Sequence, residues 1–288
     1  MKKRTAQYKR FTRSRFGNFL YFLFLIAAGL FTVLPLIYSV VTSFKPLDEL
    51  LAFPPRFFVV RPTWKNFAAL PDLLSNLEVP FIRYVFNQLF VTFAVVGLQL
   101  IVSVMAAFVL CQVKNKASKA LFLIIQFALL YNGTTLAVPQ YLIYCNIGII
   151  DTYWVYILPG LASTMGIFLI KQNMEASIPP VLIEAARIDG AGVWKIFTSI
   201  VLPLSKPAIL TWTLFSFQNA WAIQSGNSIF SESLKTLPSV MGSITSSGIS
   251  RSGSAMAVTV LMMIPPILVY MITQSNVLET MSHAGIKD

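Results

Sequence analysis

Charged side chains are scarce in this chain of 288 residues. Asp, Glu, Lys and Arg make up 11% of it, less than half of the share of about 25% that is usual in soluble proteins. So few charges cannot cover the surface of a soluble globular domain. The 56% share of apolar residues also excludes a disordered chain. The composition therefore predicts an integral membrane protein.

Groups that perform chemistry in enzymes are also scarce. The two cysteines, Cys111 and Cys145, lie in or beside apolar runs, and we interpret them as small buried hydrophobic residues rather than a disulfide. The one histidine, His283, is interpreted as a solvated residue near the end of the chain, so no metal site is expected. No membrane-embedded base is visible for nucleophilic catalysis. We therefore expect that the chain is not an enzyme.

Six apolar stretches are long enough to cross a hydrocarbon core of roughly 30 Å, which takes about 20 residues. They are Phe19–Phe44, Tyr84–Val113, Ala120–Cys145, Tyr153–Lys171, Pro207–Gln224 and Ala255–Asn276. The first is longer than the core of a cleavable signal peptide, so we expect it to be retained. The predicted fold is an all-α integral membrane protein with six transmembrane helices. A permease segment, 19–276, lies between a basic N-terminus, 1–18, and a tail, 277–288.

Basic residues are distributed unevenly between the two sides that six crossings define. The side with both termini holds 15 Lys and Arg and 5 acidic residues, which gives a net charge of +10. The other side holds 7 Lys and Arg and 6 acidic residues, which gives a net charge of +1. Cytoplasmic loops of membrane proteins carry an excess of Lys and Arg, so both termini are predicted to be cytoplasmic. Nucleic-acid binding by the basic N-terminus is the rival interpretation, but it needs a further assumption, so no nucleic-acid partner is expected.

The longest predicted cytoplasmic loop, residues 172–206, lies between the fourth and fifth helices. Pro179 and Pro180 suit the first turn of a helix, where a missing N–H has no intrahelical partner, and Gly190 suits its end. A second short amphipathic run follows, and Pro203 precedes the next spanning helix. The loop is therefore predicted to form a helix–turn–helix knob. It either lies on the lipid surface or inserts into a cytoplasmic partner.

The residues of this knob resemble a family signature. Glu184-Ala185-Ala186, followed by Gly190 and then by Ile200 and Leu202-Pro203, is similar at every spacing to the EAA motif of ABC-importer permeases. The extended form Glu-Ala-Ala-Arg-Ile-Asp-Gly-Ala at 184–191 resembles the carbohydrate-uptake branch, with its maltose-type and glycerol-3-phosphate-type permeases.

The likeness extends over most of the chain. Other segments that resemble the same branch are Ser43-Phe44-Lys45-Pro46, Asn66-Phe67, Asn87 and the end, Ala284-Gly285-Ile286-Lys287. The sequence departs from the family in the fifth helix, where Asn219-Ala220-Trp221-Ala222 stands in place of Trp-Asn-Asp. It also departs in the tail, at Ser282-His283 and Asp288.

The resemblance implies a mechanism of coupling. In the family, EAA loops form coupling helices that sit in a cleft of an ATPase subunit and transmit ATP-driven closure to the spanning helices. By this resemblance the ATPase-coupling residues are Glu184, Ala185, Ala186, Asp189 and Gly190, and Lys287 of the tail contacts the partners too. The sequence holds no G-x-x-x-x-G-K-[ST] phosphate loop. ATP and Mg are therefore expected on the partner subunits, and no cofactor is expected in this chain.

The resemblance also implies a complete assembly. The expected partners are a second permease in a heterodimer, two ATPase subunits, an extracytoplasmic solute-binding protein and the bilayer of a bacterial cytoplasmic (inner or plasma) membrane. The expected function is ATP-driven import of a sugar or oligosaccharide. A glycerol-3-phosphate-type permease is an alternative, but a phosphorylated substrate calls for cations along the path, and the predicted helices offer none.

Aromatic and amide side chains in the fifth predicted helix suit a neutral polyhydroxylated solute, because amides hydrogen-bond hydroxyl groups and rings pack on sugar C–H faces. The candidate translocation-path residues are Trp212, Gln218, Asn219 and Trp221. Gln218 and Trp221 are three residues apart, so we expect them to share a face of the helix. Hydrogen bonding between helices is the commoner role of amides in membranes, and helix packing remains the alternative for these residues.

Two other functional classes stay open. An ion-coupled secondary carrier usually needs intramembrane acidic residues, and the six stretches hold none. A membrane enzyme or an assembly scaffold is the third hypothesis, which turnover of a substrate by the isolated chain would support.

Overall fold

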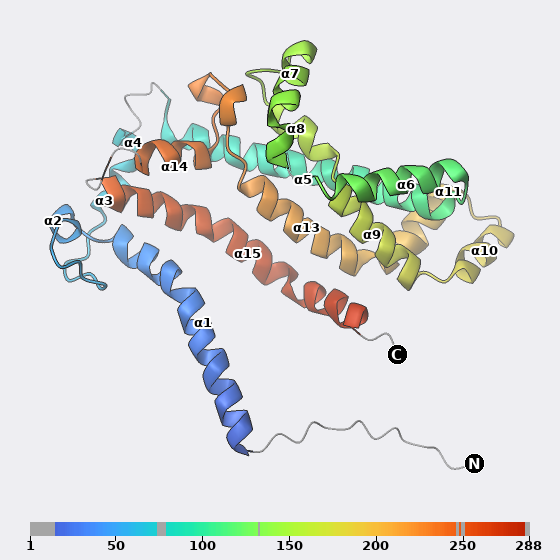
Figure 1. Ribbon diagram of the computed structural model, residues 1–288, viewed down its shortest axis with the longest axis horizontal. Helices are drawn as coiled ribbons and strands as arrows, with labels where there is room; N and C mark the ends of the chain where they lie inside the picture. The colour runs from blue at the N-terminus through green and yellow to red at the C-terminus, as the bar shows by residue number, and fades with distance from the viewer. Residues whose placement is uncertain (1–14, 74–78, 132, 246–247, 249–250, 286–288) are drawn as a thin grey trace.

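The computed structural model describes residues 15–73, 79–131, 133–245, 248 and 251–285 of the chain. Within these ranges every regular element is helical, as the sequence predicts. The body is elongated, and α5, α13 and α15 run side by side along it (Figure 1).

Three long helices carry the first, second and sixth predicted spans. They are α1 (Arg15–Ser43), α5 (Phe81–Gln112) and α15 (Ser252–Gly285). Each contains a stretch long and apolar enough to cross a membrane. Pro35 lies inside α1, and Pro265 and Pro266 lie inside α15. Membrane helices tolerate such prolines where neighbours satisfy the freed backbone groups.

The fourth and fifth predicted spans are interrupted or bent. Helices α8 (Trp154–Leu161) and α9 (Thr164–Ser177) are separated by two residues and together make one candidate span. The hydroxyl oxygen of Ser163 accepts a hydrogen bond from the N–H of Gly166 at 3.0 Å and so caps α9. Helix α13 (Lys206–Trp221) carries the fifth stretch and is bent by 75° from the helical segment before it.

The third predicted stretch, Ala120–Cys145, is not one continuous helix. It consists of α6 (Lys116–Ala128) and α7 (Ala137–Ile147), joined through the short 3-10 helix η2 (Gly133–Leu136). Both helices are shorter than the roughly 17 residues that a straight crossing takes. The described residues thus hold four helices that can span a membrane, or five if the bent pair counts as one span. Hydropathy alone does not register helix breaks, so the sequence predicted a single helix here.

Several short helices lie at the two ends of the body, whereas α7 and α8 lie beside its middle (Figure 1). The end that we call the α14 end carries α2 (Leu47–Leu50), α3 (Lys65–Ala68), α4 (Leu70–Leu73) and α14 (Leu237–Thr245). The opposite end, the α10 end, carries α10 (Pro180–Ile188) and α11 (Val193–Ile196). The loop with the EAA-like motif therefore lies at the opposite end from the loops that follow α1 and α13.

Apolar clusters hold the helices together along α5. One, toward the α14 end, includes Val91, Val95, Tyr156, Phe217 and Trp221. Another, which we call the α10-end cluster, includes Val104, Phe108, Ile170, Ile196, Phe197, Val201 and Trp212. Leu100 of α5 packs against both clusters. A third, at the α14 end, joins α4, α5, α14 and α15.

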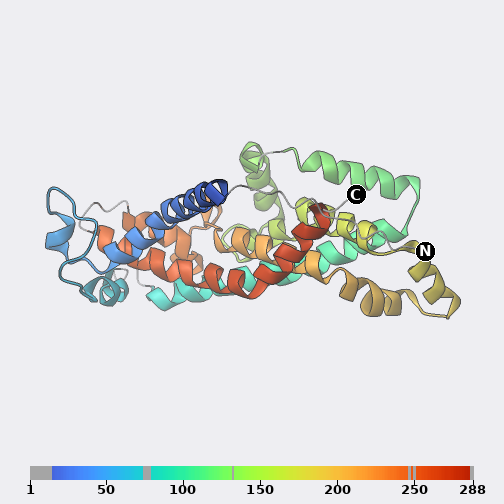
Figure 2. The same ribbon diagram turned by 90° about the horizontal axis from the view of Figure 1, so that it is seen from below.

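Helix α1 differs from the other long helices because it packs mainly on α15 and lies along the outside of the body (Figure 2). Residues 18–38 of α1 are all exposed, although most of them are apolar. An apolar surface of this length needs lipid or another protein to cover it.

Candidate functional site

The loop between α9 and α13 forms the predicted pair of short helices. Pro180 occupies the first turn of α10, and Pro179 precedes it with an extended backbone. Helix α10 ends at Ile188, and Gly190 has a φ of +78°, in the left-handed region that glycine adopts without strain. The N–H of Ala191 then donates to the carbonyl of Ala186 at 2.9 Å and closes the turn. The proline and glycine positions thus act as the sequence predicts.

The second half of the loop packs onto the body. Gly192 precedes α11, and the helix continues through the π-helical segment η3 (Phe197–Val201) and α12 (Leu202–Leu204) into the bend before α13. Ile196, Phe197 and Val201 are buried in the α10-end cluster. The second half of the loop therefore belongs to the α10-end cluster and leads directly into α13.

The two faces of α10 have different environments. Ile183 and Ala186 pack against the α10-end cluster. Val181, Ala185 and Ile188, which the sequence places on one face, are exposed, with 71% of Val181 and 86% of Ile188 accessible. Helix α10 therefore presents an apolar face away from its own chain.

Helix α11 adds to this exposed surface. Val193 and Trp194 are exposed, and the Trp194 ring lies with its centroid 5.4 Å from that of Phe197. Exposed apolar side chains on two adjoining short helices mark a site that contacts another protein or a membrane surface.

The polar residues of the motif lie on the surface of the knob. Glu184, Arg187 and Asp189 are exposed. The guanidinium of Arg187 donates from Nη2 to Oε1 of Gln112, at the end of α5, at 2.9 Å. Glu184 lies only three residues from Arg187 in the chain, but the bond to Gln112 ties α10 to α5. Gln112 was not anticipated, because no local pattern relates two residues so far apart in the chain.

A cavity of about 370 Å³ lies beneath α10, against the ends of α5 and α9. It is lined by Phe108, Cys111, Gln112, Lys114, Met174, Glu175, Ile178, Pro180, Ile183, Glu184, Arg187 and Val201. This space separates part of α10 from the body, and the bond between Arg187 and Gln112 lies at its wall.

The four candidate path residues of α13 do not lie together. Gln218 and Asn219 are exposed, whereas Trp212 and Trp221 are buried. The indole N–H of Trp221 donates to the carbonyl of Met262 in α15 at 2.9 Å, and its ring stacks on Phe217. Gln218 and Trp221 therefore do not share the common environment that their spacing suggested.

Trp212 packs between helices. It is 3% exposed, and a Cβ built at Gly166 of α9 would lie only 2.5 Å from its ring. Burial and this close approach give Trp212 and Trp221 packing contacts within the chain. Of the four residues, Gln218 and Asn219 are the ones that a solute or a second chain can reach.

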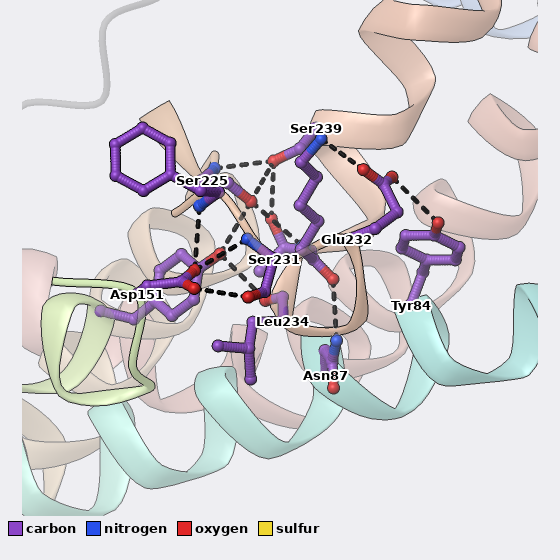
Figure 3. A network of polar contacts seen from close by, with 12 residues as sticks. Tyr84, Asn87, Asp151, Ser225, Ser231, Glu232, Leu234 and Ser239 are labelled. Atoms are coloured by element: carbon purple, nitrogen blue, oxygen red, sulfur yellow. Dashed lines mark hydrogen bonds and ion pairs between the residues drawn. The ribbon is translucent and has the colours of Figure 1, made fainter. Parts of the chain in front are cut away.

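A polar network at the α14 end was not predicted (Figure 3). Asp151 has a φ of +58° and accepts hydrogen bonds from the N–H groups of Phe230 and Ser231, at 2.9 and 2.8 Å, and from the Ser231 hydroxyl. The hydroxyl and N–H of Ser231, together with the N–H of Phe230, lower the pKa of the Asp151 carboxyl because they stabilise its charged form.

The same network fastens the loop after α13 to α5 (Figure 3). Asn87 donates from Nδ2 to the carbonyls of Ser233 and Lys235 at 2.8 and 2.9 Å. The Tyr84 hydroxyl donates to Glu232 at 3.0 Å, and the Tyr153 hydroxyl donates to Oδ1 of Asn87 at 2.7 Å. The loop, which contains η4 (Gly226–Ser228) and η5 (Glu232–Leu234), is thus held firmly on the body.

Parts of the predicted site lie outside the described residues. Lys287 and the basic residues before position 15 belong to them, so their contacts stay predictions. Within the described part of the chain, no group of three or more His, Cys, Asp or Glu side chains is placed to hold a metal ion.

Several proteins resemble the chain in sequence, whereas no protein-family model matches it. Protein LplC of Bacillus subtilis (strain 168) is 32% identical over 199 residues, which cover 69% of this chain and 65% of LplC, just under two thirds of its length. The polygalacturonan/rhamnogalacturonan transport system permease protein YtcP of the same strain is 29% identical over 73% of this chain and 70% of YtcP. A putative ABC transporter permease, ORF2 of Caldicellulosiruptor sp. (strain Rt8B.4), is 28% identical over 93% of this chain and 96% of that protein.

A solved structure resembles the fold. It is a bacterial ABC transporter involved in the import of the acidic polysaccharide alginate, with a TM-score of 0.77 and 22% identity. The match covers 91% of this chain and 98% of that chain, so the two chains share one arrangement of helices. Sequence likeness, fold and the EAA-like loop agree: the chain is a multi-pass membrane protein that is similar to ABC-transporter permeases, among them one for polygalacturonan and rhamnogalacturonan.

Proposed function

We propose that the chain is one transmembrane subunit of an ATP-driven importer that takes up an oligosaccharide across a bacterial cytoplasmic membrane. The observation that carries this proposal is the knob at residues 180–194. It bears the EAA-like motif, presents the exposed apolar side chains of Val181 and Ile188, and is tied to the core through Arg187.

The proposed topology has six crossings. The candidate spans are α1, α5, the pair α8 and α9, the bent segment that ends in α13, and α15. The helices α6 and α7 together supply the remaining crossing as a broken span. The α10 end and both termini are cytoplasmic in this arrangement, because the excess of Lys and Arg lies on that side.

The proposed coupling runs through named contacts. An ATPase subunit receives the exposed side of α10 and the turn after it, where Glu184, Ala185, Asp189 and Gly190 lie, and Ala186 packs beneath them on the α10-end cluster. Closure of the ATPases moves α10, and the bond between Arg187 and Gln112 passes this movement to α5. The buried residues of η3 pass it to the bend before α13. ATP and Mg are held by the ATPase subunits, and this chain supplies no catalytic group.

The second permease and the solute-binding protein are assigned to surfaces of the chain that the ATPase subunit does not cover. A second, non-identical permease covers the exposed side of α13, so that Gln218 and Asn219 line a path between the two chains. An extracytoplasmic solute-binding protein docks at the α14 end, where hydrogen bonds hold the loop after α13 in one conformation. Lys287 of the tail contacts the ATPase side.

The substrate class rests on the side chains of the path and on the relatives. Exposed amides such as Gln218 and Asn219 hydrogen-bond sugar hydroxyl groups, and YtcP and the alginate transporter are both named for polysaccharides. Binding of a panel of neutral oligosaccharides, oligouronates and glycerol 3-phosphate to the cognate solute-binding protein distinguishes the substrates. Tight binding of glycerol 3-phosphate alone would contradict the oligosaccharide assignment.

Co-purification of the ATPase with the tagged chain tests the docking claim. Gly190→Pro and Glu184→Lys should each remove the ATPase, since the first blocks the left-handed turn and the second reverses a charge on the docking face. Arg56→Gln, an equally exposed charge change at the α14 end, is the matched control and should leave the ATPase bound. Unchanged ATPase binding and uptake in both loop variants would contradict the proposal.

A further inference from the structure

A second cavity, of about 330 Å³, lies beside the one beneath α10. It is lined by Leu110, Cys111, Val113, Lys114, Ser118, Lys119, Phe122, Lys171 and Glu175. Three of these side chains are cationic and one is anionic, so the cavity carries an excess of positive charge. Leu110, Val113 and Phe122 make another part of its wall apolar.

Lys171 is the most buried of the three lysines, with 7% of the residue exposed. Its Nζ lies 2.7 Å from Oε1 of Glu175 and 3.9 Å from the ring centroid of Phe122. Taking an ammonium group out of water costs several kcal/mol, and ionisable residues inside membrane helices usually serve a function. The charge of Lys171 is thus kept in a buried position at a cost in desolvation free energy. It lies against the ring of Phe122, which lines the same cavity.

Lys114 and Lys119 are exposed where they line the cavity. They stand at the junction between α5, which ends at Gln112, and α6, which begins at Lys116. Helix α9 also ends nearby, at Ser177. The cavity therefore lies at the level where three helices leave the apolar part of the molecule.

We propose that this cavity binds the phosphate headgroup of an anionic phospholipid, with Lys114 and Lys119 facing the phosphate and Leu110, Val113 and Phe122 facing the start of the acyl chains. The site rests on the proposed function, which puts the α10 end at the cytoplasmic membrane surface. Basic pockets between transmembrane helices on that side bind anionic headgroups. The apolar wall favours a lipid over free phosphate, which shares the charge but gains nothing from that wall.

A lipid in this position contacts the coupling machinery. Cys111, Lys114 and Glu175 line both this cavity and the one beneath α10. The headgroup therefore lies next to the space that separates α10 from the body, where it braces the coupling loop.

Native mass spectrometry of the complete importer, purified in detergent and titrated with defined lipids, tests the site. Wild type should retain phosphatidylglycerol in preference to phosphatidylcholine with the same acyl chains. Lys114→Gln and Lys119→Gln should each lower that preference about fivefold, because a lysine near an anionic headgroup contributes about 1 kcal/mol. Lys116→Gln removes the same charge from the same helix, but Lys116 does not line the cavity, so this control should keep the preference.

Glu175→Gln supplies a test of opposite sign, because it removes the anion from the cavity and should raise the preference for phosphatidylglycerol.

Equal losses in the Lys116→Gln and Lys119→Gln variants would show a diffuse charge effect and overturn the site. Inorganic phosphate that displaces phosphatidylglycerol at millimolar concentration would overturn the lipid assignment. An importer that keeps its ATPase and its uptake but shows no lysine-dependent lipid preference contradicts this site alone. A chain that keeps the preference but never binds an ATPase contradicts the importer function alone.

Discussion

Trp212 lies directly against Gly166, and this contact holds α13 on α9. Gly166→Ala places a Cβ 2.5 Å from the indole ring, so the ring or a helix must shift. Overpacking of this kind costs about 1–3 kcal/mol. We expect a lower unfolding temperature for the detergent-purified chain, measured by thermal shift.

Gly97→Ala in α5 is the matched control. A Cβ at Gly97 meets nothing within 4 Å, and alanine is favoured over glycine inside a helix by roughly 0.5–1 kcal/mol. Its unfolding temperature should equal or exceed that of the wild type. If both variants behave alike, the contact between Trp212 and Gly166 is looser than described.

The hydrogen bonds to the Asp151 carboxylate at the α14 end are expected to be sensitive to acid. Its pKa in the folded state is lowered by the hydrogen bonds from Ser231 and Phe230, so its carboxylate stabilises the fold above the unfolded pKa of about 4. This stabilisation is lost as pH falls through the lower, folded pKa. The unfolding temperature of the wild type should therefore drop below about pH 4 more steeply than that of Asp151→Asn. Asparagine also tolerates the positive φ, and parallel pH profiles would contradict the prediction.

At the scale of single elements, the two faces of α10 give a testable prediction. Ile188 is 86% exposed and lies on the proposed docking face, so Ile188→Ser should lower the amount of co-purified ATPase without lowering the unfolding temperature of the isolated chain. Ile183→Ser, on the face that packs on the α10-end cluster, should lower the unfolding temperature. Loss of stability in Ile188→Ser with full ATPase binding would mean that this face is not the docking surface.

Helix ends were easier to predict from the sequence than helix partners. Pro180 and Gly190 fix where α10 begins and ends, because their backbone preferences are local. The break between α6 and α7 escaped prediction, since an apolar run has the same hydropathy whether or not the helix continues. The partners of Asn87 and Arg187 also escaped, because they lie more than 70 positions away in the chain.

In the candidate site, too, local features were predicted from the sequence and contacts between distant residues were not. The exposed position of Glu184 and Ala185 on the knob agrees with the docking hypothesis, whereas their contact with an ATPase stays a prediction. Composition marked Trp212 and Trp221 as path residues, but it cannot tell which side of α13 is buried. Packing against Gly166 and the bond to Met262 put both rings inside the chain.

At the scale of the whole molecule, charge and exposure indicate a subunit oriented in a membrane. The predicted cytoplasmic side carries a net charge of +10 against +1 on the other. The apolar residues of α1 between positions 18 and 38 are exposed and need lipid or a partner chain.

Thiol labelling of intact cells tests this orientation. In a chain whose own cysteines are replaced by serine, Phe230→Cys should react with a membrane-impermeant reagent, because Phe230 is 64% exposed at the α14 end. Lys195→Cys at the α10 end should react only after the membrane is opened. Labelling in the reverse pattern would invert the topology.

The proposed role of the knob in this chain is to couple ATP hydrolysis in the ATPase subunits to import. Its most direct test is uptake of a labelled oligosaccharide by proteoliposomes that contain the chain, the second permease and the ATPases, with the loaded solute-binding protein outside. Uptake should require ATP inside the vesicles, survive collapse of the ion gradients and be lost in Gly190→Pro. Uptake that continues without ATP and stops when the ion gradient collapses would contradict this role.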